Sequence, residues 1–280
     1  MIFDDRRCEL GEGPLWHPLR EQLFWFDILG RSLLSRDETG PRQWQFPQMV
    51  SAAGWISRDV LLIAGETGLF RFDLTSGTSE PLAALEADNP QTRSNDGRAD
   101  PQGGFWIGTM GKKAETGAGA IYRYFRGELR KLFPSISIPN SMCFTPDGRT
   151  AQFADSPTRR VMRVSLDAQG WPVGEPQVFL QLAPNGPEPD GAVMDVDGVT
   201  WLAEWGAARV AAYAPDGSYL RSVPFDAPHT SCPAFGGTTL YCTSALQGMD
   251  DAARSAKPHA GKTFIAKSVA QGQLEHQVIL

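Results

Sequence analysis

The stretch Asn140-Ser-Met-Cys-Phe-Thr-Pro-Asp-Gly-Arg-Thr-Ala-Gln-Phe-Ala154 combines a polar first residue, a short apolar run, a turn and a second apolar run. Asp147-Gly148 marks the turn, because Asp and Gly supply the backbone angles that tight hairpins require. Each of the two apolar runs has the character of a strand. The stretch therefore predicts a β-hairpin.

Five other parts of the chain share this pattern. Three of them begin at a polar residue, Glu12, Asn95 or Asp190, and continue into a turn and a second apolar run. Two further copies emerge once this register is imposed, with turns at Arg58-Asp59 and Gly236-Gly237. The copies follow one another at roughly 40 to 50 residues, which is the period of four-stranded propeller blades.

Six copies of a strand-rich unit predict an all-β fold. We expect a six-bladed β-propeller with four-stranded antiparallel blades around a central channel, formed as one domain by residues 1–280. Propellers commonly complete one blade with strands from both chain ends, so residues 273–280 and residues 2–10 are both candidates for the outer strand of the last blade.

Two further features concern the mouth of the channel. The long polar link at residues 247–261 is a candidate lid. Trp205, at the end of a second strand, is a candidate for the border of the cavity.

The composition is that of an ordinary globular protein, with 41% hydrophobic and 21% charged residues. The formal net charge of -6 argues against a nucleic-acid partner, which usually demands a basic face. No apolar stretch has the length of a membrane span or of a signal-peptide core, so we expect no membrane association and a cytoplasmic location. The four cysteines lack CxxC spacing and are expected to be free and buried. A small acidic chain of this kind can be a monomer.

The blade register makes a prediction about the middle of the molecule. Counting six residues back from the residue before each turn selects six polar positions: Glu12, Ser51, Asn95, Asn140, Asp190 and His229. The first strand of each propeller blade lines the central channel, so equivalent positions form a ring around the axis. The sequence therefore predicts a ring of polar side chains at one mouth of the channel.

The chemistry of this ring favours a metal site. Glu12 and Asp190 supply two negative charges, and the amide oxygens of Asn95 and Asn140 add neutral donors. Such oxygen donors suit a hard divalent cation, namely calcium, magnesium or manganese. Zinc is retained as an alternative, because catalytic zinc also accepts carboxylate ligands. Polar residues at strand starts often only satisfy the backbone of loops, and this is the favoured interpretation for Ser51 and His229.

Several motifs resemble one known family. They are Leu10-Gly-Glu-Gly-Pro-Leu-Trp-His17, Ser94-Asn-Asp-Gly-Arg-Ala-Asp-Pro101, Gly108-Thr-Met110, Ile138-Pro-Asn-Ser141, Pro189-Asp-Gly191 and Phe235-Gly-Gly237. In this order and at blade spacing they are similar to the senescence marker protein-30, gluconolactonase and luciferin-regenerating enzyme-like family. The resemblance covers nearly the whole chain.

The resemblance implies a propeller that binds one divalent metal in its channel and hydrolyses lactones of sugar acids. It implies that Glu12, Asn140 and Asp190 are the protein ligands of the metal. It also implies that Asn95 lies near metal and substrate, and that Arg93 contacts hydroxyl or carboxyl oxygens of the substrate. Some relatives place an acidic residue shortly after Gly-Thr-Met, where this chain has Gly111-Lys112-Lys113, so sugar contacts from that loop do not carry over.

Lactone hydrolysis also suits the ring on chemical grounds, because a metal with an open coordination position can polarise a carbonyl or lower the pKa of bound water. The hypothesis gives Asp190 a double role as ligand and general base, and Arg93 the role of orienting the polyol.

Other functions remain as alternatives. They are two other hydrolase classes, metal-dependent esterases and phosphotriesterases, as well as a noncatalytic calcium-binding propeller and a binding module of WD-repeat type. No Gly-x-Ser-x-Gly or His-Glu-x-x-His motif points to another mechanism.

Overall fold

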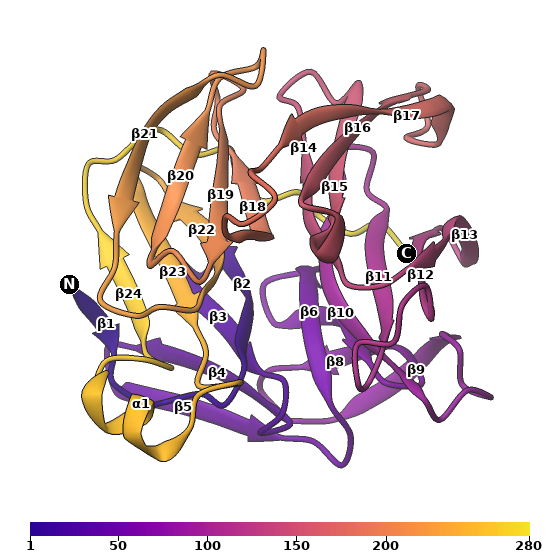
Figure 1. Cartoon of the computed structure of the whole chain (residues 1–280). Coiled ribbons are helices and arrows are strands. Elements are labelled where there is room, and N and C mark those ends of the chain that lie inside the picture. Colours follow the sequence, from indigo (N-terminus) through magenta and orange to yellow (C-terminus); the bar gives the residue numbers. More distant parts are fainter.

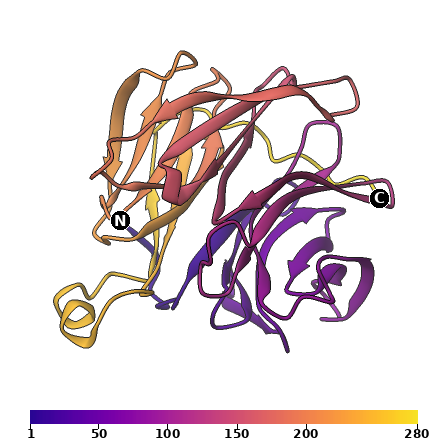
Figure 2. The same cartoon turned by 45° about the vertical axis from the view of Figure 1, so that its right-hand side comes forward.

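The computed structural model describes all 280 residues and contains six four-stranded sheets arranged around a common axis (Figure 1 and Figure 2). The strands of the first three blades are β2 (Gly11–His17), β3 (Gln22–Asp27), β4 (Ser32–Asp37) and β5 (Gly40–Gln45); β6 (Val50–Trp55), β7 (Val60–Gly65), β8 (Gly68–Asp73) and β9 (Ser79–Ala84); and β10 (Thr92–Ala99), β11 (Phe105–Gly111), β12 (Gly119–Phe125) and β13 (Glu128–Ile136). Within each blade, neighbouring strands are antiparallel.

The second half of the chain repeats this arrangement. Its strands are β14 (Pro139–Phe144), β15 (Thr150–Asp155), β16 (Arg160–Leu166) and β17 (Pro172–Gln181); β18 (Glu188–Met194), β19 (Thr200–Trp205), β20 (Arg209–Tyr213) and β21 (Tyr219–Pro224); and β22 (Thr230–Gly236), β23 (Thr239–Ser244), β24 (Thr263–Ala266) and β1 (Ile2–Asp4). The predicted six-bladed propeller with four-stranded antiparallel blades is confirmed.

The first strands of the blades form the inner wall of the propeller. Each of β2, β6, β10, β14 and β18 contacts the next inner strand in this order, and β22 contacts β2, which closes the ring. All six inner strands run in the same direction along the channel. Their first residues therefore lie at one mouth of the channel and their last residues at the other.

The turns after the inner strands follow the predicted chemistry. Gly148 and Gly198 adopt φ of 67° and 78°, in the left-handed region that disfavours residues with a Cβ atom. The carboxylate of Asp147 accepts a hydrogen bond from the backbone N–H of Arg149 over 3.0 Å, which stabilises the same turn. These local contacts explain why the Asp-Gly pairs identify the hairpins in the sequence.

The hydrophobic core lies between the blades. Trp106 of β11 contacts Phe144 of β14 edge to face, with ring centroids 5.6 Å apart, and Trp201 of β19 contacts Phe235 of β22 in the same way at 5.7 Å. Both tryptophans are at most 1% exposed, and the four cysteines are buried and free, as expected. Because apolar side chains fill the space between sheets, the channel is left to polar residues.

Helical structure is confined to two short segments. They are the 3-10 turn η1 (Ser156–Thr158) and the helix α1 (Asp251–Ala256), which lies in the polar link of the last blade. Neither these nor any other segment forms a helix long and apolar enough to cross a membrane.

The last blade is closed by the beginning of the chain. β1 pairs with β24 in the antiparallel sense, which makes residues 2–4 the outer strand of this blade. Of the two candidates for this place, the N-terminal segment is therefore correct. Residues 273–280 instead cross the end of the channel where the inner strands finish, and the yellow tail can be followed to the C terminus in Figure 1 and Figure 2.

The C-terminal tail is held to several blades. The backbone N–H groups of Val278 and Ile279 donate to the carbonyls of Trp55 and Gly103 over 2.9 and 2.8 Å. The side-chain amide of Gln273 donates to the carbonyl of Phe144 over 3.0 Å. The tail therefore ties together inner-strand ends that are far apart in the sequence.

A buried ion pair anchors the middle of this tail. The carboxylate of Glu275 accepts a hydrogen bond from the guanidinium of Arg98, and both side chains are at most 10% exposed. Arg98 also donates to the carbonyls of Met142 and Ala192 over 3.1 and 3.3 Å. Arg98 thus joins the tail to strands β10, β14 and β18.

Glu275→Ala is expected to lower the free energy of unfolding by about 3 to 5 kcal/mol, because it leaves the buried charge of Arg98 without its partner. Urea denaturation measures the loss. Leu274→Ala is the matched control in the same tail, since Leu274 is 75% exposed and is expected to change stability little. Equal stability of the Glu275 variant and the unmodified protein would contradict the anchoring role.

Candidate functional site

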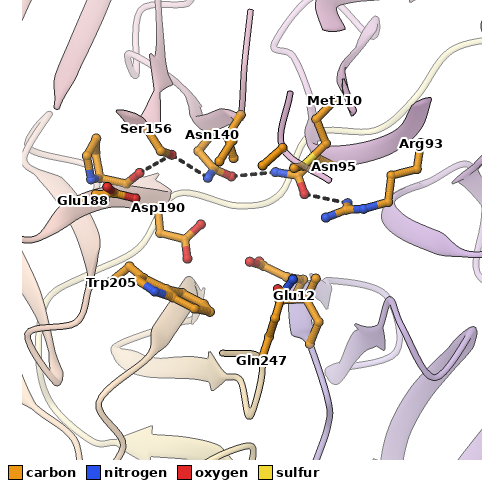
Figure 3. Close-up of a pocket in the computed structure, with 14 residues that line it drawn as sticks. Glu12, Arg93, Asn95, Met110, Asn140, Ser156, Glu188, Asp190, Trp205 and Gln247 are labelled. Atoms are coloured by element: carbon orange, nitrogen blue, oxygen red, sulfur yellow. Dashed lines mark hydrogen bonds between the residues drawn. The ribbon is translucent and has the colours of Figure 1, made fainter. Parts of the chain in front are cut away.

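A cavity of about 220 Å³ opens at the mouth of the channel where the inner strands begin. Its lining brings together all five side chains that the sequence selects as functional: Glu12, Arg93, Asn95, Asn140 and Asp190 (Figure 3). They come from β2, β10, β14 and β18, which belong to four different blades. The volume suits a small ligand rather than a drug-sized one.

The inner strands share a local irregularity that directs these side chains. In the four strands that carry the candidates, the register against the second strand shifts between Glu12 and Leu15, Ser94 and Gly97, Asn140 and Cys143, and Pro189 and Ala192. A bulge of this kind bends the strand and re-aims a side chain that regular alternation would place elsewhere. Glu12, Asn95, Asn140 and Asp190 lie at or within these irregular segments, which allows them to face the cavity, whereas Arg93 lies in the regular pairing just before one of them.

Two carboxylates face each other across the cavity (Figure 3). Glu12 and Asp190 are only 7% and 5% exposed, and neither forms an ion pair with an arginine, lysine or histidine. Burial and the charge of the neighbouring Asp96 raise the pKa of Glu12 above its usual value. Burial and the charge of Glu12 raise the pKa of Asp190 well above its usual range. The pair is therefore costly to keep ionised without a cation between the two groups.

The donor set fits a hard divalent cation. No three His, Cys, Asp or Glu side chains are grouped to hold a metal by themselves, so the candidate ligands are two carboxylates supplemented by amide oxygens. Asn140 and Asn95 contribute those amides to the same cavity. Oxygen donors of this kind match the preference of calcium, magnesium and manganese, and a divalent charge would offset the repulsion between the two buried carboxylates.

Arg93 places a fixed donor group beside these residues. It is 5% exposed, and its Nη1 donates to the carbonyl of Ser94 and to Asn95 Oδ1, both over 2.8 Å. Burial lowers the pKa of Arg93 to about 10, although the negative charges of Glu12 and Glu66 raise it. At this pKa the guanidinium keeps its charge near neutral pH. Its remaining donors are available to an oxygen-rich ligand in the cavity.

Two positions of the predicted ring do not line the cavity. The hydroxyl of Ser51 donates to Ser94 Oγ over 2.8 Å, between two neighbouring inner strands. His229 precedes β22, and its ring stacks on Trp205 with centroids 4.2 Å apart and an interplanar angle of 8°. The predicted ring therefore reaches the cavity at four of its six positions, and Ser51 and His229, for which the sequence favours a local structural role, are not among them. His229 lies before the start of β22, whereas the four ring residues that line the cavity lie within their inner strands.

Other lining residues lie at the ends of second strands. Arg93 is paired with Met110, and Glu188 with Trp205, while Ser156 directly follows β15. Antiparallel pairing places the end of each second strand beside the beginning of its first strand. Trp205 was predicted from the sequence to border the cavity, whereas Met110 and Ser156 were not. Extending the ring rule to second-strand ends would have found them.

The loops around the mouth add a few further groups. Lys112, in the segment that departs from the family pattern, forms an ion pair with Glu66 over 2.6 Å and does not line the cavity. Of the polar link at residues 247–261, only Gln247 lines it. Glu188, which also lines the cavity, pairs with Arg159 over 3.2 Å.

The fold and the site define a six-bladed β-propeller in which carboxylate and amide side chains converge at one mouth of the channel. Residues 10–246 match the model of the SMP-30/Gluconolactonase/LRE-like region. The chain belongs to this family.

Curated relatives align over almost the full length. A protein of Rhizobium meliloti (strain 1021), provisionally named a sugar lactone lactonase, is 44% identical over 279 residues, with 98% of this chain and 95% of the relative covered. The L-arabinolactonase of Azospirillum brasilense is 36% identical, with 95% and 91% covered. The crystal structure of regucalcin from Agrobacterium tumefaciens, described as a calcium-binding protein, superimposes with a TM-score of 0.97 at 41% identity and covers 100% of this chain and 97% of that one.

Proposed function

We propose that this protein hydrolyses the lactone of a sugar acid to the aldonic acid with the help of one divalent metal ion. The observation that carries the proposal is the pair Glu12 and Asp190, two buried carboxylates without an ion-pair partner that face one small cavity together with Asn95 and Asn140. Relatives named as lactonases make a lactone the first substrate class to consider.

Glu12, Asn140 and Asp190 would hold the metal. When bound, it would supply positive charge for the carbonyl oxygen of the lactone and lower the pKa of a bound water. The candidate ions are calcium, magnesium, manganese and zinc. Which of them is bound in the cell depends on metal availability as well as on affinity.

The protein side chains carry the remaining work. Asp190 accepts a proton from the water that attacks the lactone carbonyl carbon. Attack of the water forms the new C–O bond and a tetrahedral carbon, and the ring C–O bond then breaks. The proton held by Asp190 passes to the ring oxygen, which becomes a hydroxyl group. Arg93 and Asn95 bind oxygens of the substrate and fix its position.

Trp205 is the apolar side of the proposed substrate site. Its indole lines the cavity and is backed by the ring of His229, which restricts its orientation. A sugar lactone has C–H groups on one face and hydroxyl groups around its rim. We place the C–H face against Trp205 and the hydroxyl groups toward Arg93 and Asn95.

One specific observation favours a second candidate, a noncatalytic calcium-binding propeller. The structural neighbour with a TM-score of 0.97 is described as a calcium-binding protein, and the same carboxylates and amides would serve binding alone. An esterase or phosphotriesterase activity is the other alternative, because the same metal chemistry acts on those bonds.

A substrate panel separates these functions. Acid release is followed in a pH-stat with aldonolactones, aryl esters and phosphotriesters, each with added calcium, magnesium, manganese or zinc and again with chelator. We expect turnover that is highest on an aldonolactone and is abolished by chelator. Cation binding without turnover would instead establish the binding protein, and preference for an aryl ester or phosphotriester would establish the other hydrolase class.

A further inference from the structure

Four hydrogen bonds form a continuous chain above the two carboxylates (Figure 3). Arg93 Nη1 donates to Asn95 Oδ1 over 2.8 Å, and Asn95 Nδ2 donates to Asn140 Oδ1 over 3.1 Å. Asn140 Nδ2 then donates to Ser156 Oγ over 2.8 Å, and the Ser156 hydroxyl donates to the carbonyl of Pro189 over 2.6 Å. The chain begins in β10, passes through β14 and η1, and ends in β18 beside Asp190.

The direction of this chain is fixed at both ends. Arg93 can only donate hydrogen bonds, and the carbonyl of Pro189 can only accept them. Ser156 has one hydroxyl hydrogen, which is committed to Pro189, so its oxygen must accept from Asn140. Asn95 must likewise turn its oxygen to Arg93 and its nitrogen to Asn140. Each amide between the ends therefore has one favourable orientation.

This direction determines which atom Asn140 offers to the cavity. With its nitrogen bound to Ser156, the amide turns its oxygen toward Asn95, and Asn140 lines the cavity (Figure 3). A carbonyl oxygen has two lone pairs, so one of them stays available to a cation after the bond from Asn95. A rotated amide would present a nitrogen, which cannot bind a hard cation.

Ser156 is itself held firmly. It is 3% exposed, and its backbone N–H donates to the carbonyl of Ile138 over 3.1 Å, next to the strand that carries Asn140. Its own carbonyl accepts a hydrogen bond from the N–H of Arg159 over 3.0 Å, which closes the η1 turn. The hydroxyl is therefore presented to Asn140 from a backbone position that is fixed on both sides.

We propose that Ser156 is a positioning residue of the cation site, which sets the orientation of the Asn140 amide and anchors the backbone that precedes Asp190. This inference rests on the proposed function, because it takes Asn140 and Asp190 as ligands of the divalent metal. It adds a residue that supplies no ligand atom. Residues that orient ligands in this way typically change metal affinity by about 10 to 100-fold when removed.

The matched variants Ser156→Thr and Ser156→Val test this role. Their side chains have nearly the same shape, and only threonine keeps a hydroxyl group. Calcium and manganese are titrated into the metal-free variants in a calorimeter, and the melting temperature without metal is measured in parallel. We expect valine to weaken cation binding about 10 to 100-fold, and threonine to bind within a few-fold of the unmodified protein. Ser156→Ala, which adds no methyl group, is expected to repeat the loss.

Kinetics give a second readout. At limiting cation the valine variant is expected to lose lactone turnover in proportion to its lost affinity, and kcat at saturating cation is expected to return close to that of the unmodified protein. Unchanged cation binding by both the valine and alanine variants overturns the positioning role alone. An equal loss in threonine and valine, with an equal fall in metal-free melting temperature, also overturns it in favour of packing. Absence of cation binding by the unmodified protein overturns the proposed metal-dependent function together with this inference.

Discussion

Asp190→Asn is expected to lower lactone turnover by about 10² to 10⁴-fold at saturating cation, which is the usual contribution of a general base. The substitution preserves the size of the side chain and one oxygen that can bind a cation, as Asn140 is proposed to do. It removes the group that accepts the proton from water. Since the carboxylate is buried, no solvent base can easily replace it.

Measurements of kcat, cation affinity and melting temperature separate the possible causes. Asp216→Asn is the control in the same blade, because Asp216 lies in the exposed turn between β20 and β21 and only accepts local hydrogen bonds from Ser218. The control is expected to keep full activity. Turnover near that of the unmodified protein in the Asp190 variant, at saturating cation, would remove Asp190 from the role of base.

Glu12→Gln is expected to weaken divalent cation binding by about 10² to 10³-fold, because two opposite unit charges near a protein surface attract each other by up to about 4 kcal/mol at contact distance. Glu12 and Asp190 are the two negative charges of the candidate ligand set, so the variant retains half of the compensating charge. Lactone turnover at limiting cation is expected to fall with the affinity, and addition of chelator to the unmodified protein is expected to reduce turnover to background.

The same substitution makes a distinctive prediction for the metal-free protein. Glu12→Gln removes a buried charge that repels Asp190, so the metal-free melting temperature is expected to stay level or to rise. Glu188→Gln is the matched control, since Glu188 lines the same cavity but is paired with Arg159 and contributes less to the pKa of Asp190 than Glu12 does. A cation affinity that is equally reduced in both variants would contradict the special position of Glu12.

Much of the candidate site was accessible from the sequence because it is carried by the repeat. Glu12, Asn95, Asn140 and Asp190 occupy related places in four blades, and the ring symmetry of a propeller brings such places to one mouth of the channel. Arg93 was added by the family resemblance and also lines the cavity. Ser51 and His229 show the limit of counting, because Ser51 is hydrogen-bonded to Ser94 while His229 lies before its inner strand and stacks on Trp205.

The inner hairpin of each blade with its turn, the number of blades and four of the polar residues at the channel mouth can be predicted from the sequence. Apolar runs, Asp-Gly turns and repeat spacing are local properties of the chain, and they suffice to define each blade. Tertiary structure alone decided that β1 closes the last blade, that Glu275 meets Arg98 at the far end of the channel, and that Ser156 joins Asn140 to Pro189. These contacts connect segments that lie apart in the sequence. They depend on how the sheets pack against one another and on the direction of each hydrogen bond, which no local pattern records.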